Sequence, residues 1–347
     1  MNEINIAVCK NGDILAKDVI NEGGIIVVGH NTELNEFIIS KMKKIGIETL
    51  WIYRAASKKN MQVNNNKYVS TILGSDKESI IGVKAEIVAL AGYKQLKYGV
   101  VRQLTDVMCE NSISTDCLME YIHELYIYDN YTYSHSIHVA FYALLIGKWI
   151  HMSDCEILEV MQAGLLHDIG KVKIPKEILN KKCKLTDTEF VIIKQHSSIG
   201  YELLENSDMV SDSVKEAVLT HHERIDGSGY PAALTGINIG KYAKIIAVAD
   251  VYDAMISNRP YKRGVTPFEA FDMFTTMGTS TFEPSIVIPF LLNISSHLIG
   301  AKVKLSNGET GEVVYIPSNN LGKPIICINS SYIEISPNSN LHITCFL

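Results

Sequence analysis

Histidine and aspartate recur together in the middle of this 347-residue sequence. His167 and Asp168 are adjacent at the end of the apolar segment MQAGLLHDIGK, and Lys171 follows three residues later. If the segment forms a buried helix end, both polar side chains lose their hydration, and a ligand role or a strong hydrogen bond must offset that cost. The pair therefore indicates a chemical site.

Four other segments each carry one of these two residue types. Imidazole nitrogen and carboxylate oxygen together suit Fe, Mn or Zn, and a carboxylate can bridge two ions. Helices that each contribute one or two inward ligands build dinuclear sites in this way. The alternative for any single histidine is a hydrogen-bonded core or surface residue. The candidates are His135 in YSHSIHVAFYALL, His196 in KQHSSIGYELL, His221 and His222 at the end of VKEAVLTHH, and Asp250 in KIIAVADVYDAM.

The elements that must position these residues are predicted to be helices. Ser153-x-x-Glu156 and Thr186-x-x-Glu189 are capping boxes, and Thr266-Pro267-x-Glu269 places a proline at a first helical position. These start signals divide the region into helices of ordinary globular length. We therefore expect an all-α domain over 77–297, with its core at 131–288.

The two ends of the chain have a different texture. Residues 1–60 alternate apolar runs with turn signals around a helical pattern, which predicts a small α+β module. A sensory or regulatory role, a role in dimerisation and a merely stabilising role are all open for it. The polar, Asn- and Lys-rich stretch 54–75 reads as a linker. Short β-branched runs with Asn-Gly punctuation over 300–347 predict a small antiparallel sheet or barrel. The expected fold class is mainly α, with small modules at both ends.

The overall composition limits which partners the protein is expected to bind and in which cellular compartment it is expected to occur. A formal net charge of −6 does not favour long nucleic acid or an anionic membrane surface as the partner. The seven cysteines are scattered and never form C-x-x-C, which is typical of free thiols in a reducing compartment. The N-terminus lacks the pattern of a signal peptide, and no stretch suits a bilayer span. We expect a cytoplasmic protein.

Three segments carry a resemblance to a known family. HDIGKVKIP at 167–175, HHERIDGSGYP at 221–231 and ADVYDAMISNRPYK at 249–262 resemble the signature segments of the HD-GYP family. That family is a branch of the HD superfamily of metal-dependent phosphohydrolases, and its known activity is hydrolysis of cyclic di-GMP. The resemblance implies a helical HD-type domain that acts on a cyclic dinucleotide.

The resemblance also implies which residues bind metal. Asp168 would bridge two ions, and Asp253 is expected to form a hydrogen bond nearby instead of binding metal. Tyr131 stands where some members carry a glutamate that helps to hold a third ion, so we expect two ions, Fe or Mn. The first would be held by His135, His167, Asp168 and Asp250, and the second by Asp168, His196, His221 and His222.

Family chemistry would be attack by a metal-bridging hydroxide on the phosphodiester, giving linear pGpG, GMP or both. Asp168 and Lys171 are the implied catalytic residues. Basic side chains would grip the phosphates. In the family, the loop Gly229-Tyr230-Pro231 is associated with substrate access and with a diguanylate-synthesising partner, although a plain loop with a buried tyrosine explains it equally well. The implied phosphate-binding residues are Lys171, Arg259, Lys262 and Arg263.

Other functions remain open at this stage. A mixed cyclic GMP-AMP has the same two phosphates as cyclic di-GMP. A catalytically silent module would sense the nucleotide or recruit a partner, and the same metal cage in relatives of the HD fold oxidises small substrates with dioxygen. Lys171 and the NRPYKR cations favour phosphate over that last reaction. The apolar helical pattern over 77–127 is either a connector, a homodimer surface or part of the protein's own core.

Overall fold

The computed structural model describes the two ends of the chain and most of its helical centre. Arg259, Lys262 and Arg263 lie outside the described residues, and so do the predicted linker at 54–75 and the helical pattern at 77–127. The described residues are 1–20, 26–28, 34–44, 46–53, 131–181, 183–257, 264–278, 280–336 and 340–347.

The chain divides into two compact units. One comprises 65–264 and 277–289, and the other comprises 1–64, 265–276 and 290–347. Helix α14 (Pro284–Ser296) is shared between them, and the division falls at Pro289, a proline inside this helix. The three predicted domain ranges stay a prediction.

The first unit is helical, as predicted. Its segments are α6 (Tyr131–Trp149), α7 (Asp154–Leu166), η3 (Ile169–Lys173), α8 (Lys176–Leu179), α9 (Asp187–Lys194), α10 (His196–Leu204), α11 (Asp212–Thr220), η4 (Gly236–Asn238) and α12 (Lys241–Ile256). The capping boxes form: Ser153 accepts from Glu156 N, Thr186 accepts from Glu189 N, and each glutamate accepts from its cap residue's backbone N–H. These bonds satisfy donors that a helix start leaves unpaired.

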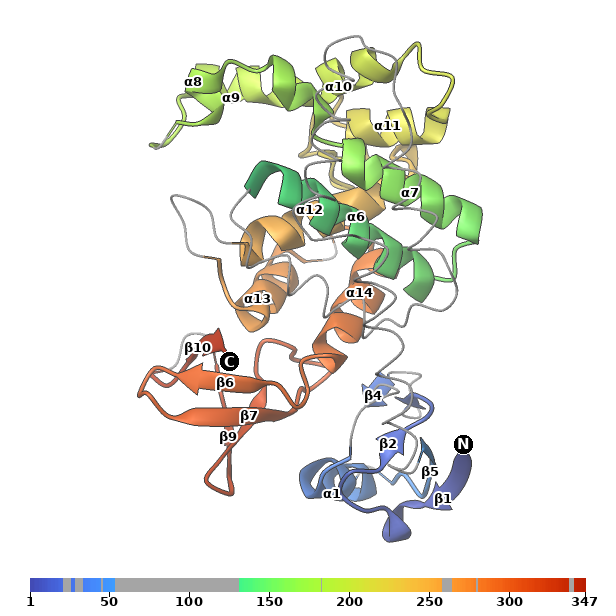
Figure 1. Ribbon diagram of the computed structural model, residues 1–347, viewed down its shortest axis with the longest axis vertical. Helices are drawn as coiled ribbons and strands as arrows, with labels where there is room; N and C mark the ends of the chain where they lie inside the picture. Colours follow the sequence, from blue (N-terminus) through green and yellow to red (C-terminus); the bar gives the residue numbers. More distant parts are fainter. Residues whose placement is uncertain are drawn as a thin grey trace, which may run out of the picture. The chain divides into compact units, whose positions relative to one another are not determined.

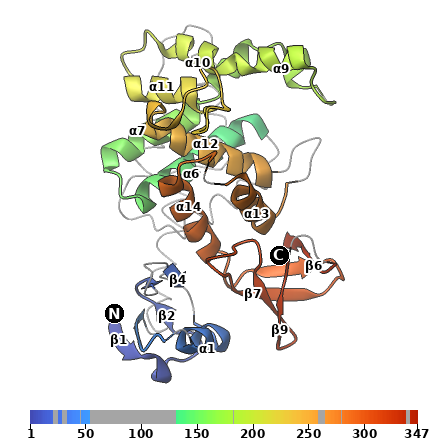
Figure 2. The ribbon, with the colours of Figure 1, turned by 180° about the vertical axis from the view of Figure 1, so that it is seen from behind.

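Helix α6 forms the centre of this unit, with α7 and α12 packed beside it (Figures 1 and 2). Its residues from 135 to 147 are all buried, as expected for a helix without a polar face. A Cβ added to Gly164 of α7 would lie 2.7 Å from Ala140 Cα of α6, so the two backbones approach closely there. Tyr142 of α6 and Tyr252 of α12 meet edge to face at 5.2 Å. Helices α6, α7 and α12, which carry or directly precede several candidate ligands, are thereby packed closely together.

The second unit contains the small modules at the chain ends. At the N-terminal end, β1 (Asn2–Asn5), β5 (Thr49–Tyr53) and β2 (Ile14–Leu15) form a sheet in the order β1-β5-β2, and β3 (Val19–Ile20) pairs with β4 (Ile26–Val28). Helix α1 (Glu36–Lys44) contributes Ile38 and Met42 to the core of this module. Helix α13 (Pro267–Met277) begins with the predicted cap, in which Thr266 N donates to Glu269.

The C-terminal end forms a five-stranded antiparallel sheet in the order β10-β6-β7-β8-β9. The predicted fold class, mainly α with small β-containing modules at the ends, is confirmed. The strands are β6 (Lys302–Leu305), β7 (Thr310–Tyr315), β8 (Ile325–Ile328), β9 (Ser331–Glu334) and β10 (Ile343–Phe346).

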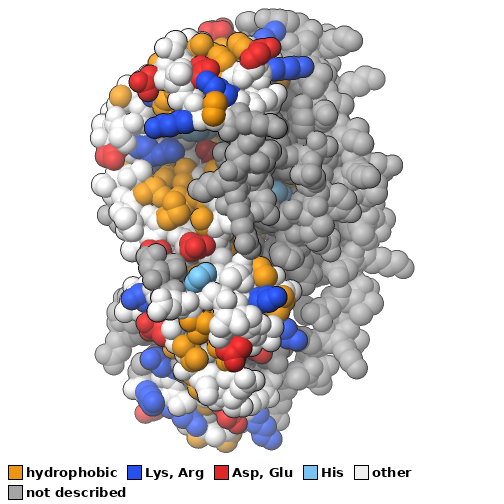
Figure 3. All heavy atoms as spheres, turned by 90° about the vertical axis from the view of Figure 1, so that its left-hand side faces the viewer, with side chains coloured by type: hydrophobic (Ala, Val, Ile, Leu, Met, Phe, Trp, Pro, Cys, Tyr) orange, Lys and Arg blue, Asp and Glu red, His pale blue; other side chains and the backbone are white. Residues whose placement is uncertain are grey.

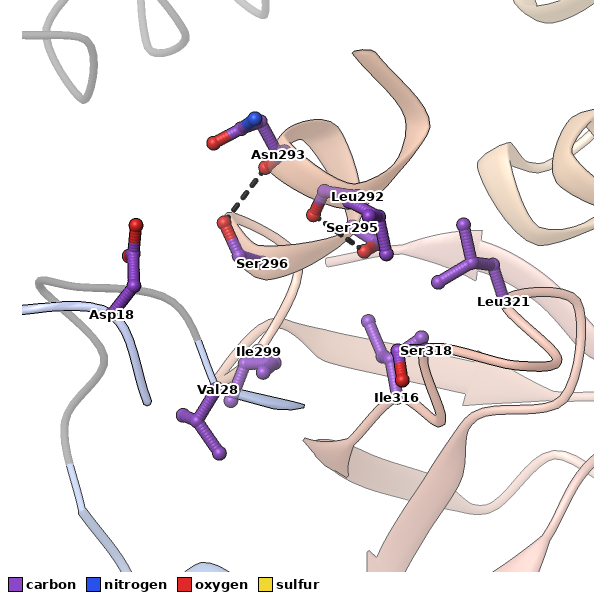
Figure 4. Close-up of a pocket in the computed structure, with 10 residues that line it drawn as sticks. All are labelled: Asp18, Val28, Leu292, Asn293, Ser295, Ser296, Ile299, Ile316, Ser318 and Leu321. Carbon is purple, nitrogen blue, oxygen red and sulfur yellow. Dashed lines mark hydrogen bonds between the residues drawn. The ribbon is translucent and has the colours of Figure 1, made fainter. Parts of the chain in front are cut away.

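A small pocket in the second unit is the hollow drawn in Figure 4. Its volume of about 30 Å³ has room for about two water molecules and none for an organic ligand. The hydroxyls of Ser295 and Ser296 on its wall donate to the carbonyls of Leu292 and Asn293, at 2.8 and 2.7 Å. The pocket is therefore a packing feature and not a candidate site.

Basic and acidic side chains of the described residues lie interspersed on the face shown in Figure 3. None of the helices in the described part of the chain has both the length and the apolar character needed to cross a bilayer.

Candidate metal centre

His167 and Asp168 lie where α7 gives way to the short helix η3. His167 is 1 % exposed, and its Nδ1 lies 2.7 Å from the carbonyl oxygen of Gly164. A carbonyl oxygen can only accept, so Nδ1 carries the proton and the lone pair lies on Nε2. Among the described residues, neither His167 Nε2 nor Asp168 Oδ1 has a hydrogen-bond partner, although both are buried. Two unsatisfied atoms of this kind are what a bound cation would satisfy.

The same arrangement occurs at two more histidines. His196 Nδ1 donates to the carbonyl of Ile193 at 2.7 Å, and His221 Nδ1 donates to that of Val218 at 2.8 Å. Both carbonyls lie in the last turn of a helix, where backbone acceptors lack intrahelical donors. Each bond fixes the ring and directs its Nε2 lone pair inward, as metal-binding histidines require.

His135 enters the cluster from α6 and is held by Asp253 of α12. Its Nδ1 lies 2.6 Å from Asp253 Oδ2, while its Nε2 lies 3.2 Å from Asp250 Oδ1 and 3.7 Å from Asp168 Oδ2. Asp253 is completely buried, and its other oxygen lies 3.0 Å from His138 Nδ1. Asp250 therefore faces the cluster, and Asp253 forms hydrogen bonds behind it.

The structure brings all seven predicted ligands into one cluster. They form three overlapping groups in which one ligand atom from each residue lies within 4.8 Å of the others. The groups are His135, His167 and Asp250; His167, Asp168 and His221; and His196, His221 and His222.

Asp168 lies between the groups. Its Oδ2 is 3.3 Å from His167 Nε2, and its Oδ1 is 3.4 Å from His196 Nε2. The carboxylate thus faces both sides of the cluster, as a bridging ligand does. The donor set and its unsatisfied atoms fit divalent cations.

Two glycines allow this close assembly. A Cβ on Gly170 would collide with the carbonyl of His196, and a Cβ on Gly200 would lie 2.9 Å from Val218. Helix α10 can therefore lie directly against η3, which brings His196 beside Asp168. Gly170 is therefore a glycine because any side chain at this position would collide with α10.

Burial and charge set the protonation states. Burial lowers the pKa values of His196 and His221, and that of His222 to about 3, so these rings are neutral near pH 7. Burial also acts to lower the pKa of His135, but hydrogen bonds to Asp250 and Asp253 outweigh it and raise that pKa to about 9. The pKa of Asp168 lies well below its usual range because His167 and Lys171 outweigh the opposing effect of burial. Neutral imidazoles and ionised carboxylates are the metal-binding forms, so His135 would release a proton when a cation binds.

Among the predicted phosphate-binding residues, the structure describes Lys171. Its Nζ lies 2.5 Å from Asp168 Oδ2, and its side chain is 27 % exposed. It therefore lies at the edge of the cluster and is partly open to solvent. Arg259, Lys262 and Arg263 stay predictions because they lie outside the described residues.

Four residues near the cluster were not predicted as site residues. His138 shares Asp253 with His135. Arg224 donates to the carbonyls of His221 and Glu223, at 3.3 and 2.8 Å. Glu223 is buried, and the Tyr230 ring stacks on His222. All four lie within eight residues or so of a candidate ligand in the sequence, and this nearness was the one sign that they belong to the site. Sequence spacing does not show where their side chains point.

The comparisons with known proteins point to the same region. Residues 122–286 match the family model described as HD domain. A cyclic di-GMP phosphodiesterase, PA4108, of Pseudomonas aeruginosa is 40 % identical over 186 residues, covering 54 % of this chain and 45 % of the relative. A cyclic di-GMP phosphodiesterase of Thermotoga maritima is 41 % identical over 164 residues, covering 47 % and 45 %.

A third relative is named for a different nucleotide. The 3′3′-cGAMP-specific phosphodiesterase 2 of Vibrio cholerae is 36 % identical over 157 residues, covering 45 % of this chain and 30 % of the relative. In all three comparisons the matched region spans less than half of the relative's own length.

Proposed function

Because the central region of this chain is an HD domain of the HD-GYP family, we propose that the protein is a metal-dependent phosphodiesterase that hydrolyses cyclic di-GMP. The observation that carries the proposal is the buried cluster of His and Asp side chains around Asp168. Names of relatives alone would not distinguish an active enzyme from a silent one, whereas a cluster that brings all seven proposed ligands together supports an active enzyme.

The ligand geometry supports two ions. His135, His167, Asp168 and Asp250 would hold one ion, and Asp168 would share the second with His196, His221 and His222. Bound divalent ions would lower the pKa of a coordinated water and offset negative charge on the phosphate in the transition state. The chain's own part is to present imidazole Nε2 atoms and two carboxylates in fixed positions, which avoids reorganisation during the reaction.

Lys171 would bind the phosphate beside the ions. Its Nζ already faces Asp168, so a phosphate oxygen at the cluster edge would replace or share that contact. Arg259, Lys262 and Arg263 would hold the second phosphate of a cyclic dinucleotide. A site that recognises phosphate in this way favours hydrolysis over oxidation of a small substrate by dioxygen.

A mixed cyclic GMP-AMP is the second candidate substrate. The similarity to a 3′3′-cGAMP-specific phosphodiesterase of Vibrio cholerae favours testing it beside cyclic di-GMP. Iron or manganese would be the metal, and linear pGpG, GMP or both would be the product.

The test is turnover by the purified full chain with added Mn²⁺ or reduced Fe²⁺, followed by chromatography of both candidate substrates and their linear products. Asp168→Asn is the inactivating variant, and Asp208→Asn, at an exposed turn, is the matched control. We expect hydrolysis of cyclic di-GMP by the wild type and the control, and its loss in Asp168→Asn. Binding of the nucleotide without hydrolysis under either metal would make the chain a sensor instead.

A further inference from the structure

His222 is supported differently from the other histidines of its group. His196 and His221 each donate Nδ1–H to a helix carbonyl, whereas within the described residues His222 has no such backbone bond. Its Nδ1 faces Asp250 Oδ2 at 3.9 Å, which is beyond hydrogen-bond range. The ring of Tyr230 lies against it instead, with a centroid distance of 4.6 Å and an interplanar angle of 28°. The rings of His221 and His196 also lie near His222, at 4.1 and 5.0 Å, but both belong to the same ligand group. Tyr230 is therefore a support for His222 that comes from outside that group.

Tyr230 belongs to a loop that Glu223 holds in place. The Glu223 side chain is 2 % exposed, and its two oxygens accept from Ala232 N at 2.7 Å and from Leu234 N at 2.9 Å. Hydrogen bonds to a buried carboxylate are stronger than those between neutral groups. Glu223, the residue after His222, thus holds the part of the loop that follows Tyr230.

The near side of the loop is held by the backbone. Tyr230 N donates to the carbonyl of His222 at 3.3 Å. A Cβ on Gly229 would lie 2.4 to 2.5 Å from the backbone of residues 222–224, so this position has no room for a side chain. Asp226 and Thr235 form an isolated bridge across the base of the loop. The segment 226–235 is therefore fastened to the chain that carries His221 and His222.

We propose that Glu223 and Tyr230 are positioning residues that orient His222 for metal binding, with Glu223 anchoring the loop and Tyr230 supporting the imidazole ring. This inference rests on the proposed metal-dependent function, and it assigns a role to the tyrosine and to the buried glutamate that the ligand set leaves unexplained. Neither residue touches the substrate in this role. In this role the loop 226–235 restricts the orientation of the His222 ring.

The test compares paired variants of the full chain. Glu223→Gln retains the shape of the side chain but leaves one oxygen to accept, and it turns an NH₂ group towards the second backbone N–H. Glu202→Gln makes the same change on the exposed side of α10 and is its control. Tyr230→Leu removes the ring, whereas Tyr230→Phe retains it and loses only the hydroxyl. Circular dichroism checks that each variant folds.

Two readouts are independent of hydrolysis. Hydrogen exchange of the metal-free protein should speed up at least about tenfold at Ala232 and Leu234 in Glu223→Gln, the loss expected for a hydrogen bond to a charged group. Mn²⁺ affinity measured by titration should fall at least about tenfold in Glu223→Gln and Tyr230→Leu, as for other residues that support metal ligands. Tyr230→Phe should retain the wild-type affinity, and Glu202→Gln should match the wild type in both measurements.

Exchange over 226–235 that stays within about twofold of wild type in Glu223→Gln would overturn the anchoring role. Unchanged Mn²⁺ affinity in Tyr230→Leu would overturn the support of His222, and so would a loss in Tyr230→Phe equal to that in Tyr230→Leu. Failure of the proposed function would look different: the wild type would bind Mn²⁺ and respond to these variants as expected, yet hydrolyse neither cyclic dinucleotide.

Discussion

The Nε2 atoms of His196 and His221 lie 3.3 Å apart, although the Nδ1–H of each ring is already donated to a helix carbonyl. Two lone pairs therefore face each other in a buried place. A cation between or beside them removes the repulsion, which is the physical reason that this pair indicates a metal site.

Metal binding should stabilise the protein. A ligand that binds the folded state at a concentration 100 times its Kd adds about 2.7 kcal/mol to the free energy of unfolding. We expect the melting temperature to rise on addition of Mn²⁺ and to fall on addition of EDTA, measured by differential scanning fluorimetry. His221→Ala should lose most of that rise. Equal melting temperatures with Mn²⁺ and with EDTA would contradict the site.

Asp253 should matter although it faces away from the proposed ions. Its oxygens accept from His135 at 2.6 Å and from His138 at 3.0 Å, and Asp253→Asn keeps one acceptor and adds a competing donor. Loss of such support typically costs about 10- to 100-fold in metal affinity or activity. Calorimetric titration of Mn²⁺ measures the effect, with Asp208→Asn as the control. An affinity within twofold of wild type would show that His135 needs no such support.

Gly170→Ala should disturb both stability and metal binding. The new Cβ would collide with the His196 carbonyl, so η3 and α10 must separate. Overpacking of this kind costs about 1–3 kcal/mol, measured by urea denaturation. Gly240→Ala is the matched control, because its Cβ would meet only the movable carboxylate of Glu216 at 3.1 Å. Equal effects of the two substitutions would argue against the close approach.

Acid should destabilise the metal-free protein through its histidines. The pKa of His222 is lowered by burial from 6.5 to about 3, so the unfolded chain binds more protons in this window. The free energy of unfolding should therefore fall as the pH drops below about 6.5, and this loss should level off near pH 3.

His135 has the opposite sign. Burial opposes its protonation, but hydrogen bonds to Asp250 and Asp253 raise its pKa to about 9, so its contribution is complete below pH 6.5 and is lost as the pH rises through 9. Together, the two groups place maximum stability of the EDTA-treated protein near pH 6.5. Urea titrations from pH 4 to 10 measure it, and stability that keeps rising towards pH 9 would contradict these assignments.

Local pattern was sufficient to find most elements. The helical pattern predicted within residues 1–60 is α1 at Glu36–Lys44, and the short β-branched runs predicted after residue 300 include β6 at Lys302–Leu305. Capping boxes at Ser153 and Thr186 start helices because their side chains replace missing backbone partners. By contrast, a local pattern indicates which face of a helix or strand is apolar, but not which other element packs against that face. The grouping of 265–276 with both chain ends could not be predicted in this way.

The sequence was sufficient to predict which residues form the site, but not how their side chains are oriented. Motifs identified the seven candidate ligands that cluster in the structure, and metal chemistry explained why His and Asp side chains should gather. The helix carbonyls that orient His167, His196 and His221 depend on where each helix ends, to within one residue. Glu223 was missed because its partners, Ala232 and Leu234, lie across a loop whose path the spacing does not determine.

The central claim is tested most directly by the rate of cyclic di-GMP hydrolysis measured against the number of Mn²⁺ ions bound per chain. Protein stripped with EDTA is reloaded in steps, and bound metal and linear product are determined for each sample. We predict no turnover without metal and full turnover when two ions are bound. Turnover by the stripped protein, or none with both positions filled, would contradict the account.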